Sequence, residues 1–200
     1  MKQLILSTFV TLASVAAIAA GKTIPAGSYA IDTAHSKIGF EVPHLVIATV
    51  EGRFTKFDGN ITIDSKLEKS KANLNIDVAS ISTDNKDRDD HLKSPDFFDV
   101  AKHEKITFVS KKVVGTADDL KLIGDLTIKG KKKEVTLNVK YLGDVNDPFG
   151  NHKIAFSAST VINRQDFGLT WSKAVEAGPV VGDEITLSIK IEANKPVAKK

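Results

Sequence analysis

The sequence contains no cysteine, one tryptophan and two tyrosines among its 200 residues. The absence of cysteine excludes disulfide bonds, thiol catalysis and any metal site that needs a thiolate ligand. A chain of this length can bury a core large enough to fold without covalent cross-links, and one domain is expected. Packing and hydrogen bonding must therefore provide its stability.

The sequence also lacks a strong excess of charge of either sign. Lysine and arginine together number 28, against 25 aspartate and glutamate residues, and the formal net charge is +3 at pH 7. Proteins that bind nucleic acids usually carry a concentrated basic surface. The balance of charge predicts that nucleic acid is not a partner of this chain.

A long apolar run occurs at the amino terminus and does not recur later in the sequence. Lys2 precedes an apolar stretch from Leu4 to Ala20, which contains hydroxyl residues and ends in Ala17-Ile18-Ala19. A positive charge, a short apolar run and small residues at its end are typical of a secretory signal peptide. We expect residues 1–20 to be a signal peptide that is cut after Ala19 or Ala20, which predicts a periplasmic location.

Alternation of apolar and polar residues dominates the remaining domain, residues 21–194. Leu74, Ile76 and Val78 alternate with polar residues, and the same pattern recurs at 135–141 and 185–191. This period of two predicts strands with one dry and one wet face. Similar runs occur at 29–32, 37–42, 52–57, 60–64, 106–114, 120–128 and 153–163. Turn signals such as Lys129-Gly130-Lys131 predict antiparallel pairing between consecutive strands.

Two segments depart from this pattern and are expected to form short helices. Pro43 to Val50 has helically spaced apolar residues after a proline, which a first helical turn tolerates. Asp84 to Val100 is too polar for a strand, and Ser94-Pro95-Asp96 is typical of an N-cap followed by proline. The fold class is therefore predicted as all-β with two short helices, followed by a frayed tail at 195–200.

About eight antiparallel strands with one apolar face can form either a two-sheet sandwich or a closed barrel. An eight-stranded barrel can fill its interior with side chains or hold one small ligand. The periodicity of the sequence does not choose between these arrangements.

Several motifs occur in a fixed order along the chain. They are Ile-Asp-Thr-Ala-His-Ser-Lys-Ile-Gly-Phe-Glu-Val at 31–42, His44, Gly-Arg-Phe-Thr-Lys-Phe-Asp-Gly at 52–59, Ile-Ser-Thr at 81–83, Arg-Asp-Asp-His-Leu-Lys-Ser-Pro-Asp-Phe-Phe-Asp at 88–99, Ile-Thr-Phe-Val-Ser at 106–110, Gly-Asp-Leu-Thr-Ile-Lys-Gly at 124–130 and Asn-Arg-Gln-Asp-Phe-Gly-Leu at 163–169. This ordered set resembles the YceI family of polyisoprenoid-binding proteins and covers about Tyr29 to Glu192. The resemblance implies a lipocalin-like, extended antiparallel β-barrel whose pore holds an isoprenoid or similar lipid chain, in a periplasmic and often dimeric protein.

If the dry face lines such a pore, a lipid chain replaces water against apolar side chains and gains about 25 cal/mol for each Å² removed from water. Plain core packing explains each of these side chains individually about as well. The candidates for the pore lining are Phe40, Leu45, Phe54, Ile76, Phe97, Phe98, Phe108, Phe156, Phe167, Leu169 and Trp171, with Ile38, Leu74, Ile128 and Leu137 as further candidates.

Three polar residues are candidates for contact with the head group of the lipid. Arg88 and His91 lie in the densest polar block of the sequence, and an arginine fork matches phosphate or quinone oxygens. Arg164 is a similar candidate, with Asp166 as its expected local partner. Alternatively, the block around Arg88 forms a salt-bridged loop that caps one end of the barrel, and this structural interpretation is favoured.

The remaining polar motifs do not favour catalysis. The five histidines lack the close spacing of metal ligands, so no metal site is predicted. Asp32, His35 and Ser36 resemble members of a catalytic triad, but Ser36 does not lie in a nucleophile elbow. The predicted function is a carrier that is not an enzyme and needs no cofactor beyond the bound lipid. The alternative is an enzyme acting on the lipid, with His91 beside Asp89 or Asp90 as its acid and base, or a redox partner that presents a quinone.

The lysines at 129–133 allow two interpretations. A basic hairpin turn is commonly a solvated device that discourages edge pairing between sheets. It could also dock on anionic lipid surfaces while the carrier is loaded. Transient membrane-surface contact is therefore among the expected associations of the chain, and the resemblance to the YceI family adds a homodimer.

Overall fold

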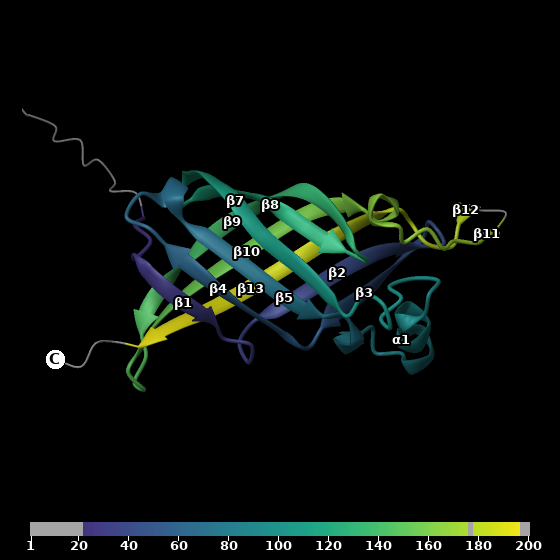
Figure 1. Ribbon diagram of the computed structural model, residues 1–200, viewed down its shortest axis with the longest axis horizontal. Coiled ribbons are helices and arrows are strands. Elements are labelled where there is room, and N and C mark those ends of the chain that lie inside the picture. Colours follow the sequence, from purple (N-terminus) through teal and green to yellow (C-terminus); the bar gives the residue numbers. More distant parts are fainter. Residues whose placement is uncertain (1–21, 176–177, 197–200) are drawn as a thin grey trace, which may run out of the picture.

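The computed structural model describes residues 22–175 and 178–196, which form an elongated β-barrel (Figure 1). The predicted signal peptide, residues 1–20, lies outside the described residues. The strands are β1 (Gly27–Ile31), β2 (Lys37–His44), β3 (Ala48–Phe54), β4 (Phe57–Ile63), β5 (Lys71–Asp77), β6 (Ile81–Ser82), β7 (Lys105–Thr116), β8 (Asp119–Ile128), β9 (Lys131–Asn146), β10 (Asn151–Asn163), β11 (Ala174–Val175), β12 (Gly178–Pro179) and β13 (Glu184–Pro196). The helices are α1 (Lys86–Lys93) and three single 3₁₀ turns, η1 (Leu67–Lys69), η2 (Val78–Ser80) and η3 (Arg164–Phe167).

The sheet closes on itself at β13. Both β1 and β2 pair antiparallel with β13, β1 at Ala193 and Asn194 and β2 from Thr186 to Lys190, so together they form one interrupted strand path. In the same way, β4 continues β3 and β6 continues β5, so that each of these two pairs of segments occupies one strand position in the barrel. β7, β8, β9 and β10 complete the ring. The result is a closed antiparallel barrel of 8 strands, which confirms the predicted barrel.

Side chains replace the missing backbone ladder where the first strand path is interrupted, at residues 32–36. The Ser36 hydroxyl donates to the carbonyl of Glu192 at 3.2 Å and accepts from the Glu192 amide at 3.0 Å. The carboxylate of Asp32 lies 3.0 Å from His35 Nδ1 and accepts a hydrogen bond from Lys153 Nζ at 3.3 Å. These bonds hold the closing seam of the barrel together.

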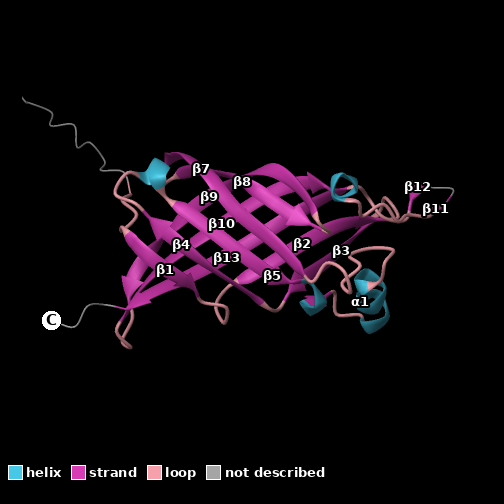
Figure 2. Cartoon of the chain, in the orientation of Figure 1, coloured by secondary structure: helices cyan, strands magenta, loops and turns pink. Residues whose placement is uncertain are grey.

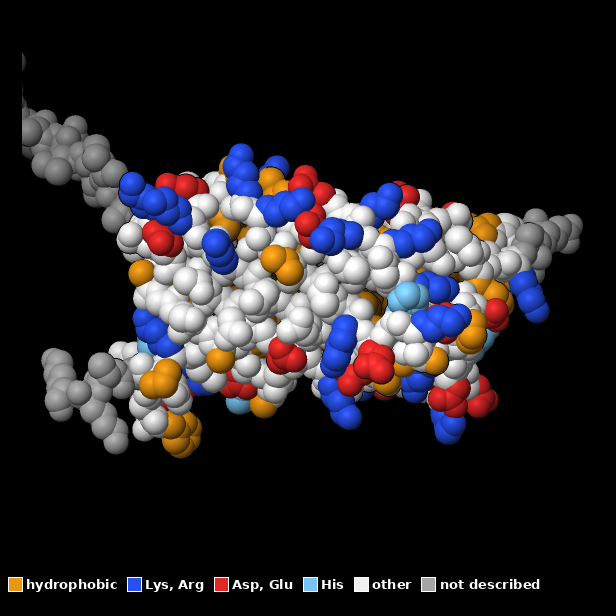
Figure 3. Space-filling view, in the orientation of Figure 1, with side chains coloured by type: hydrophobic (Ala, Val, Ile, Leu, Met, Phe, Trp, Pro, Cys, Tyr) orange, Lys and Arg blue, Asp and Glu red, His pale blue; other side chains and the backbone are white. Residues whose placement is uncertain are grey.

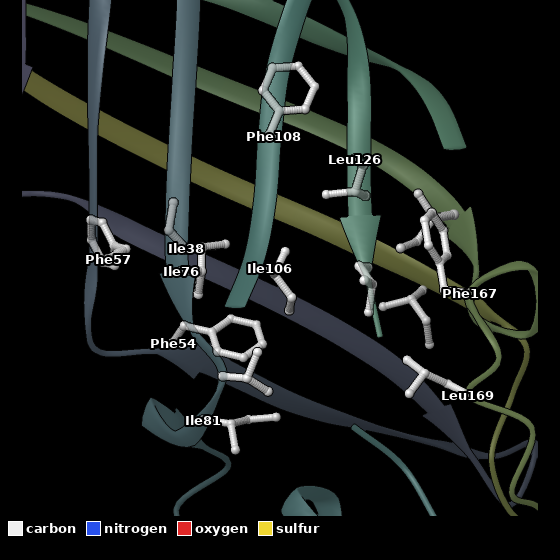
Figure 4. Packing of buried hydrophobic residues seen from close by; sticks show 14 of the residues in the cluster. Ile38, Phe54, Phe57, Ile76, Ile81, Ile106, Phe108, Leu126, Phe167 and Leu169 are labelled. Carbon is white, nitrogen blue, oxygen red and sulfur yellow. The ribbon is translucent and has the colours of Figure 1, made fainter. Parts of the chain in front are cut away.

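The interior contains two clusters of buried apolar side chains. The larger lies in the middle of the barrel and toward α1, where Phe108, Leu126 and Ile106 point from neighbouring strands into one space (Figure 4). The second packs the opposite end, around Tyr29 and Ile154, which are almost fully buried. The outer surface carries lysine and arginine side chains interspersed with acidic ones on the visible face (Figure 3). The apolar face of each strand therefore points inward, as the alternation predicts.

The predicted helix from Pro43 to Val50 is wrong. β2 continues through His44, a turn follows, and β3 begins at Ala48, which pairs with His44. Leu45 and Val46 have φ angles of 51° and 68°, which a right-handed helix does not allow. Helical spacing over so few residues was a weak signal, because the strands on either side already pair with each other.

The second predicted helix exists, but its boundary was wrong. Figure 2 shows α1 at one end of the barrel, and among the described residues it is the single α-helix. Asn85 is its N-cap, with a side chain that accepts from the Arg88 amide at 3.0 Å. Ser94, the expected N-cap, instead ends the helix, because Pro95 disfavours a helical conformation of the residue before it.

The predicted frayed tail begins too early. β13 extends through Pro196, and Lys195 Nζ donates to the carbonyl of Ala26 at 2.7 Å and lies 4.7 Å from the ring centroid of Tyr29. Residues 197–200 lie outside the described residues. None of the helices found within 22–175 and 178–196 has the length and apolar character needed to cross a membrane.

Replacing Asp32 with asparagine is expected to weaken the seam in a pH-dependent way. The hydrogen bond with His35, with further bonds from Asn194 and Lys153, holds the pKa of the Asp32 carboxyl well below its usual value. Such a carboxyl stabilises the fold above its unfolded pKa of about 3.9, and this contribution is lost as the pH falls further toward the folded value. We expect Asp32→Asn to lower the free energy of unfolding by about 2 kcal/mol at pH 7.

Urea unfolding at a series of pH values measures this effect. The difference between Asp32→Asn and the wild type should shrink below about pH 4, where the wild-type carboxyl begins to lose its advantage. The matched control is Asp118→Asn, which removes an exposed carboxylate and should cost less than about 0.5 kcal/mol. If both variants lose the same free energy of unfolding, the seam network contributes no more to stability than an exposed carboxylate does.

Candidate functional site

A cavity of about 420 Å³ lies inside the barrel, within the range typical of sites for small ligands. It extends from Ile24 and Leu67 at the end packed by the second core cluster to Trp171 and Val180 at the end that carries α1. Its walls come from all around the ring and are almost entirely apolar. A space of this size is therefore not filled by the protein's own side chains.

The structure places most of the predicted pore residues on the wall of this cavity. Those that line it are Phe40, Phe54, Ile76, Phe97, Phe98, Phe108, Phe156, Leu169 and Trp171, together with Ile38, Leu74, Ile128 and Leu137. Their contact with a ligand stays a prediction.

Two of the predicted pore residues do not belong to the lining. Leu45 lies in the β2–β3 turn, where its positive φ takes the chain out of the wall. Phe167 lies in η3, beyond the end of β10, and its buried ring packs into the larger core cluster. Both were chosen for their apolar character, and neither lies on a strand.

A further set of lining residues, which was not among the candidates, lies on strands that were predicted correctly. They are mainly short or branched apolar residues on β8, β9, β10 and β13, such as Leu122, Leu126, Val135, Val139, Ala158, Ile162, Ile185, Leu187, Ile189 and Ile191. The period-two alternation could have found them, because each lies on the apolar face of its strand.

Two phenylalanine rings of the wall are accommodated by glycines on the neighbouring strands. Phe40 pairs across the strands with Gly52, and a methyl group at Gly52 would lie 2.2 Å from Phe40 Cζ. A methyl group at Gly124 would likewise lie 2.6 Å from Cζ of Phe108. The glycines leave room for the rings to lie against the wall, which keeps the interior open.

The cavity opens at the end of the barrel that carries α1. Lining residues at this end reach the surface: Arg88 is exposed, and the side chain of His91 is 41% exposed. At the opposite end, the lining residues Ile24 and Ile63 are buried. We call the α1 end the mouth.

His91 is part of an aromatic group at the mouth. Its ring lies edge-on to Phe97 and Trp171, at centroid distances of 5.1 Å and 5.0 Å, and its Nε2 lies 2.9 Å from an oxygen of Asp96. Three residues that the sequence analysis selected are thus brought together. The partner of His91 is Asp96, however, and neither Asp89 nor Asp90 as the enzymatic alternative required.

Those two aspartates have other partners. Asp89 accepts hydrogen bonds from the amide and the hydroxyl of Thr83, at 2.8 Å and 2.6 Å. Asp90 pairs with Lys86, and this hydrogen bond lowers the pKa of the Asp90 carboxyl. The acid and base pair proposed from the sequence is therefore not formed.

Arg88 is held at the mouth by Thr83. Its Nε donates to the Thr83 hydroxyl at 2.7 Å and its Nη2 to the Thr83 carbonyl at 2.8 Å. A guanidinium carries five N–H donors, so these two bonds orient the group and leave donors for a ligand. Arg88 thus combines a structural role with an exposed charge beside the cavity.

Arg164 has a different position. It is 3% exposed and donates to the carbonyls of Gly182, Leu169, Trp171 and Val181 and to the carboxylate of Asp183. All five N–H donors are used in these bonds. The expected partner Asp166 was wrong, and the geometry gives Arg164 the task of tying the segment 164–183 to the barrel.

Three residues at the seam are arranged in a way that resembles a metal site. Ligand atoms of Asp32, His35 and Glu192 lie within 4.8 Å of one another. Lys153 Nζ, however, lies 2.6 Å from Glu192 Oε1 and 3.3 Å from Asp32 Oδ2, so an ammonium group already neutralises the two carboxylates. The hydroxyl of Ser36 is bonded to the backbone of Glu192. The arrangement is that of a structural network on the barrel wall.

Comparison with known proteins gives one consistent family. The family model of the YceI-like domain matches residues 29–193. A UPF0312 protein from Pectobacterium carotovorum subsp. carotovorum is 34% identical over 188 residues, which cover 92% of this chain and 95% of the relative.

Solved structures are similar as well. The YCEI protein of Campylobacter jejuni has 34% identity and a TM-score of 0.67, over 82% of this chain and 95% of that one. A domain from Saccharophagus degradans, described as polyisoprenoid binding and implicated in plant cell wall breakdown, has a TM-score of 0.62 over 84% of this chain and 98% of that one. Its 18% identity shows similarity of fold.

Substituting alanine for Gly52 is expected to narrow the cavity. The new methyl group would collide with the ring of Phe40. Because the ring can move and the backbone of the wall cannot, the ring would be pushed into the cavity. Because overpacking typically costs 1 to 3 kcal/mol, we expect the affinity for a polyene fatty-acid probe to fall by about tenfold. Fluorescence titration measures this affinity. The double variant Gly52→Ala/Phe40→Ala removes the collision and should recover the loss, whereas equally weak binding in both variants would contradict the explanation.

Proposed function

This chain belongs to the family of YceI-like domains, and on that premise we propose that it is a binding protein which holds one long apolar lipid of the polyprenyl or isoprenoid-quinone type inside its barrel. The observation that carries the proposal is the apolar cavity along the barrel axis. An extended hydrocarbon chain has the shape and the polarity that such walls accept.

The free-energy cost of the cavity supports an apolar occupant. The side chains around an unfilled space lose the contacts that closer packing would give them, and any water that enters it meets almost entirely apolar walls. A hydrocarbon chain that packs against the walls recovers much of this cost, because it supplies the contacts that side chains do not.

The distribution of polar groups supports a lipid whose head remains at the mouth. Thr83, Arg88 and His91 lie there. Ser70, Lys71 and Asn73 also adjoin the cavity away from the mouth, but its walls as a whole are almost entirely apolar. The guanidinium of Arg88 can donate to phosphate or quinone oxygens. The fold shared with the Saccharophagus degradans domain described as polyisoprenoid binding supports an isoprenoid chain as the apolar part.

We propose that the protein binds its lipid without transforming it. In support, His91 is paired with Asp96 and packed between two aromatic rings, and Ser36 is bonded to the backbone of the seam. The amino-terminal segment, which has the character of a signal peptide, supports a periplasmic site of action. The expected homodimer and the alternative of a redox partner that presents a quinone stay predictions.

Blocking the cavity from one strand position is expected to remove the bound lipid. Ala158 lines the cavity on β10, and Ala158→Trp would place an indole across it. Organic extraction of protein purified without detergent, followed by mass spectrometry, measures the retained chain. We expect Ala158→Trp to retain at least about tenfold less lipid than the wild type, since overpacking and lost burial both oppose binding.

The control introduces the same side chain on the opposite face of the same strand. Ser159 is exposed, so Ser159→Trp should leave the retained lipid at the wild-type level. Circular dichroism and thermal unfolding establish that both variants fold. Full retention of the chain by folded Ala158→Trp would place the lipid outside the barrel.

The role of Arg88 is tested by comparing a polyprenyl phosphate with the uncharged polyprenol of the same length. We expect Arg88→Ala to weaken phosphate binding by about tenfold and to leave polyprenol binding unchanged, because hydrogen bonds to a charged group contribute about 1.5 to 3 kcal/mol. Lys86→Ala removes another cation from α1 and serves as the control. If Arg88→Ala binds both lipids as the wild type does, Arg88 is a structural residue of the mouth.

A further inference from the structure

The turn between β2 and β3 carries an apolar tip where a polar turn would be expected. Leu45, Val46 and Ile47 follow one another, and the side chains of Val46 and Ile47 are 65% and 90% exposed. Leu45 and Val46 also adopt positive φ angles of 51° and 68°, a conformation that branched residues disfavour and that glycine, asparagine or aspartate accept readily. The sequence therefore keeps exposed apolar residues at a place where polar ones would fit better.

This tip lies on the rim of the mouth. The Leu45 amide donates to the carbonyl of Val180 at 3.1 Å, and the Gly182 amide donates to the carbonyl of Pro43 at 2.8 Å. Figure 1 shows the end of β2 beside the β11–β12 hairpin, beyond the end of the barrel. Because Val180 and Val181 also line the cavity, the tip adjoins the apolar wall of the interior.

A basic turn lies at the same end of the barrel. Lys129 and Gly130 form the turn between β8 and β9, and Lys131, Lys132 and Lys133 follow it. Lys129 Nζ donates to the carbonyl of Pro95, in the segment that follows α1, and Lys131 lies against Gly168 beside η3. These contacts place the lysines around the mouth.

Several of the acidic groups at this end are paired with basic side chains. Asp90 pairs with Lys86 and Lys93, Asp99 with Lys102, and Asp96 lies against His91. The lysine turn therefore adds positive charge near the apolar tip. Positive charge beside exposed apolar side chains matches a bilayer that contains anionic lipids.

We infer that the tip Leu45-Val46-Ile47 inserts into the surface of a bilayer with anionic lipids and brings the mouth to the source of the lipid. The inference rests on the proposed function, since a chain that moves between bilayer and barrel needs a continuous apolar route. A tip of three residues offers much less area than the roughly 1,000 Å² of a specific protein interface. A small apolar tip beside basic residues instead combines apolar burial with electrostatic attraction, the two contributions that together bind a protein to an anionic bilayer.

Cosedimentation with vesicles of phosphatidylcholine and phosphatidylglycerol in equimolar amounts tests the inference. The double variant Val46→Asn/Ile47→Ser removes the apolar side chains and places at 46 a residue that tolerates positive φ. We expect it to bind these vesicles at least about tenfold more weakly than the wild type. The emission of Trp171, the single tryptophan of the chain, should shift to shorter wavelength with wild-type protein and much less with the variant.

The matched control is Phe149→Ser. Phe149 is 86% exposed in the turn between β9 and β10, at the opposite end of the barrel, and its loss should leave vesicle binding unchanged. Replacing Lys131, Lys132 and Lys133 with glutamine should weaken binding to the mixed vesicles and have little effect on vesicles of phosphatidylcholine alone. Wild-type affinity in the tip variant, or a larger loss in Phe149→Ser, would overturn the inference.

Mass spectrometry of the purified variants separates this inference from the proposed function. A tip variant that still contains the co-purified chain, yet no longer binds vesicles, has the result expected from both proposals. A tip variant that binds vesicles normally and contains the chain overturns the inference that the tip inserts into the bilayer, but it is consistent with the proposed carrier function. Wild-type protein without any bound chain overturns the carrier, whatever the vesicles show.

Discussion

Closure of the sheet at β13 is the constraint on which the rest of the structure depends. One edge of β13 pairs with both β1 and β2, and the residues between them, 32–36, complete the edge with side chains. Closure turns the apolar face of every strand toward a shared interior. Without the seam, the same strands would have to bury that face by folding one part of the sheet onto another, and no cavity would form.

Contacts at the two ends of the barrel stabilise the fold, and the walls between the ends enclose the space for a ligand. One end is packed by the cluster around Tyr29 and Ile154, and the other is tied by Arg164 and by the loop that contains α1. The walls between them line a cavity, and glycines such as Gly52 let large rings lie against the wall. A protein without disulfides can keep such a space open because buried side chains pack tightly at the closed end and along the wall.

Similar residue types proved to have different roles at the mouth. Arg88 and Arg164 were selected for the same reason, yet Arg164 is buried with all its donors used, whereas Arg88 is exposed and oriented by Thr83. His91 could have paired with an aspartate of its own helix, and it lies instead against Asp96 from the following loop. The burial of Arg164 depends on carbonyl groups at 181 and 182, which are distant along the chain. Thr83 and Asp96 lie only five residues from Arg88 and His91, but the path of the loops that bring them into contact is not evident from residue type.

The sequence by itself determined the strand pattern, the inward faces and the polar character of the segment that forms α1, because period, turn residues and composition are local properties. It also indicated part of the cavity wall, because most of the apolar residues chosen from the alternation do line the cavity. Only the tertiary structure decided that the barrel closes, that Pro43 to Val50 is a hairpin and that Leu45 and Phe167 lie off the wall. Closure depends on the pairing of β13 with β1 and β2, which are far apart along the chain, and the free energy of that pairing is not encoded in any short stretch of residues. The hairpin at 43–50 is local, but helical spacing over so few residues does not distinguish it from a helix.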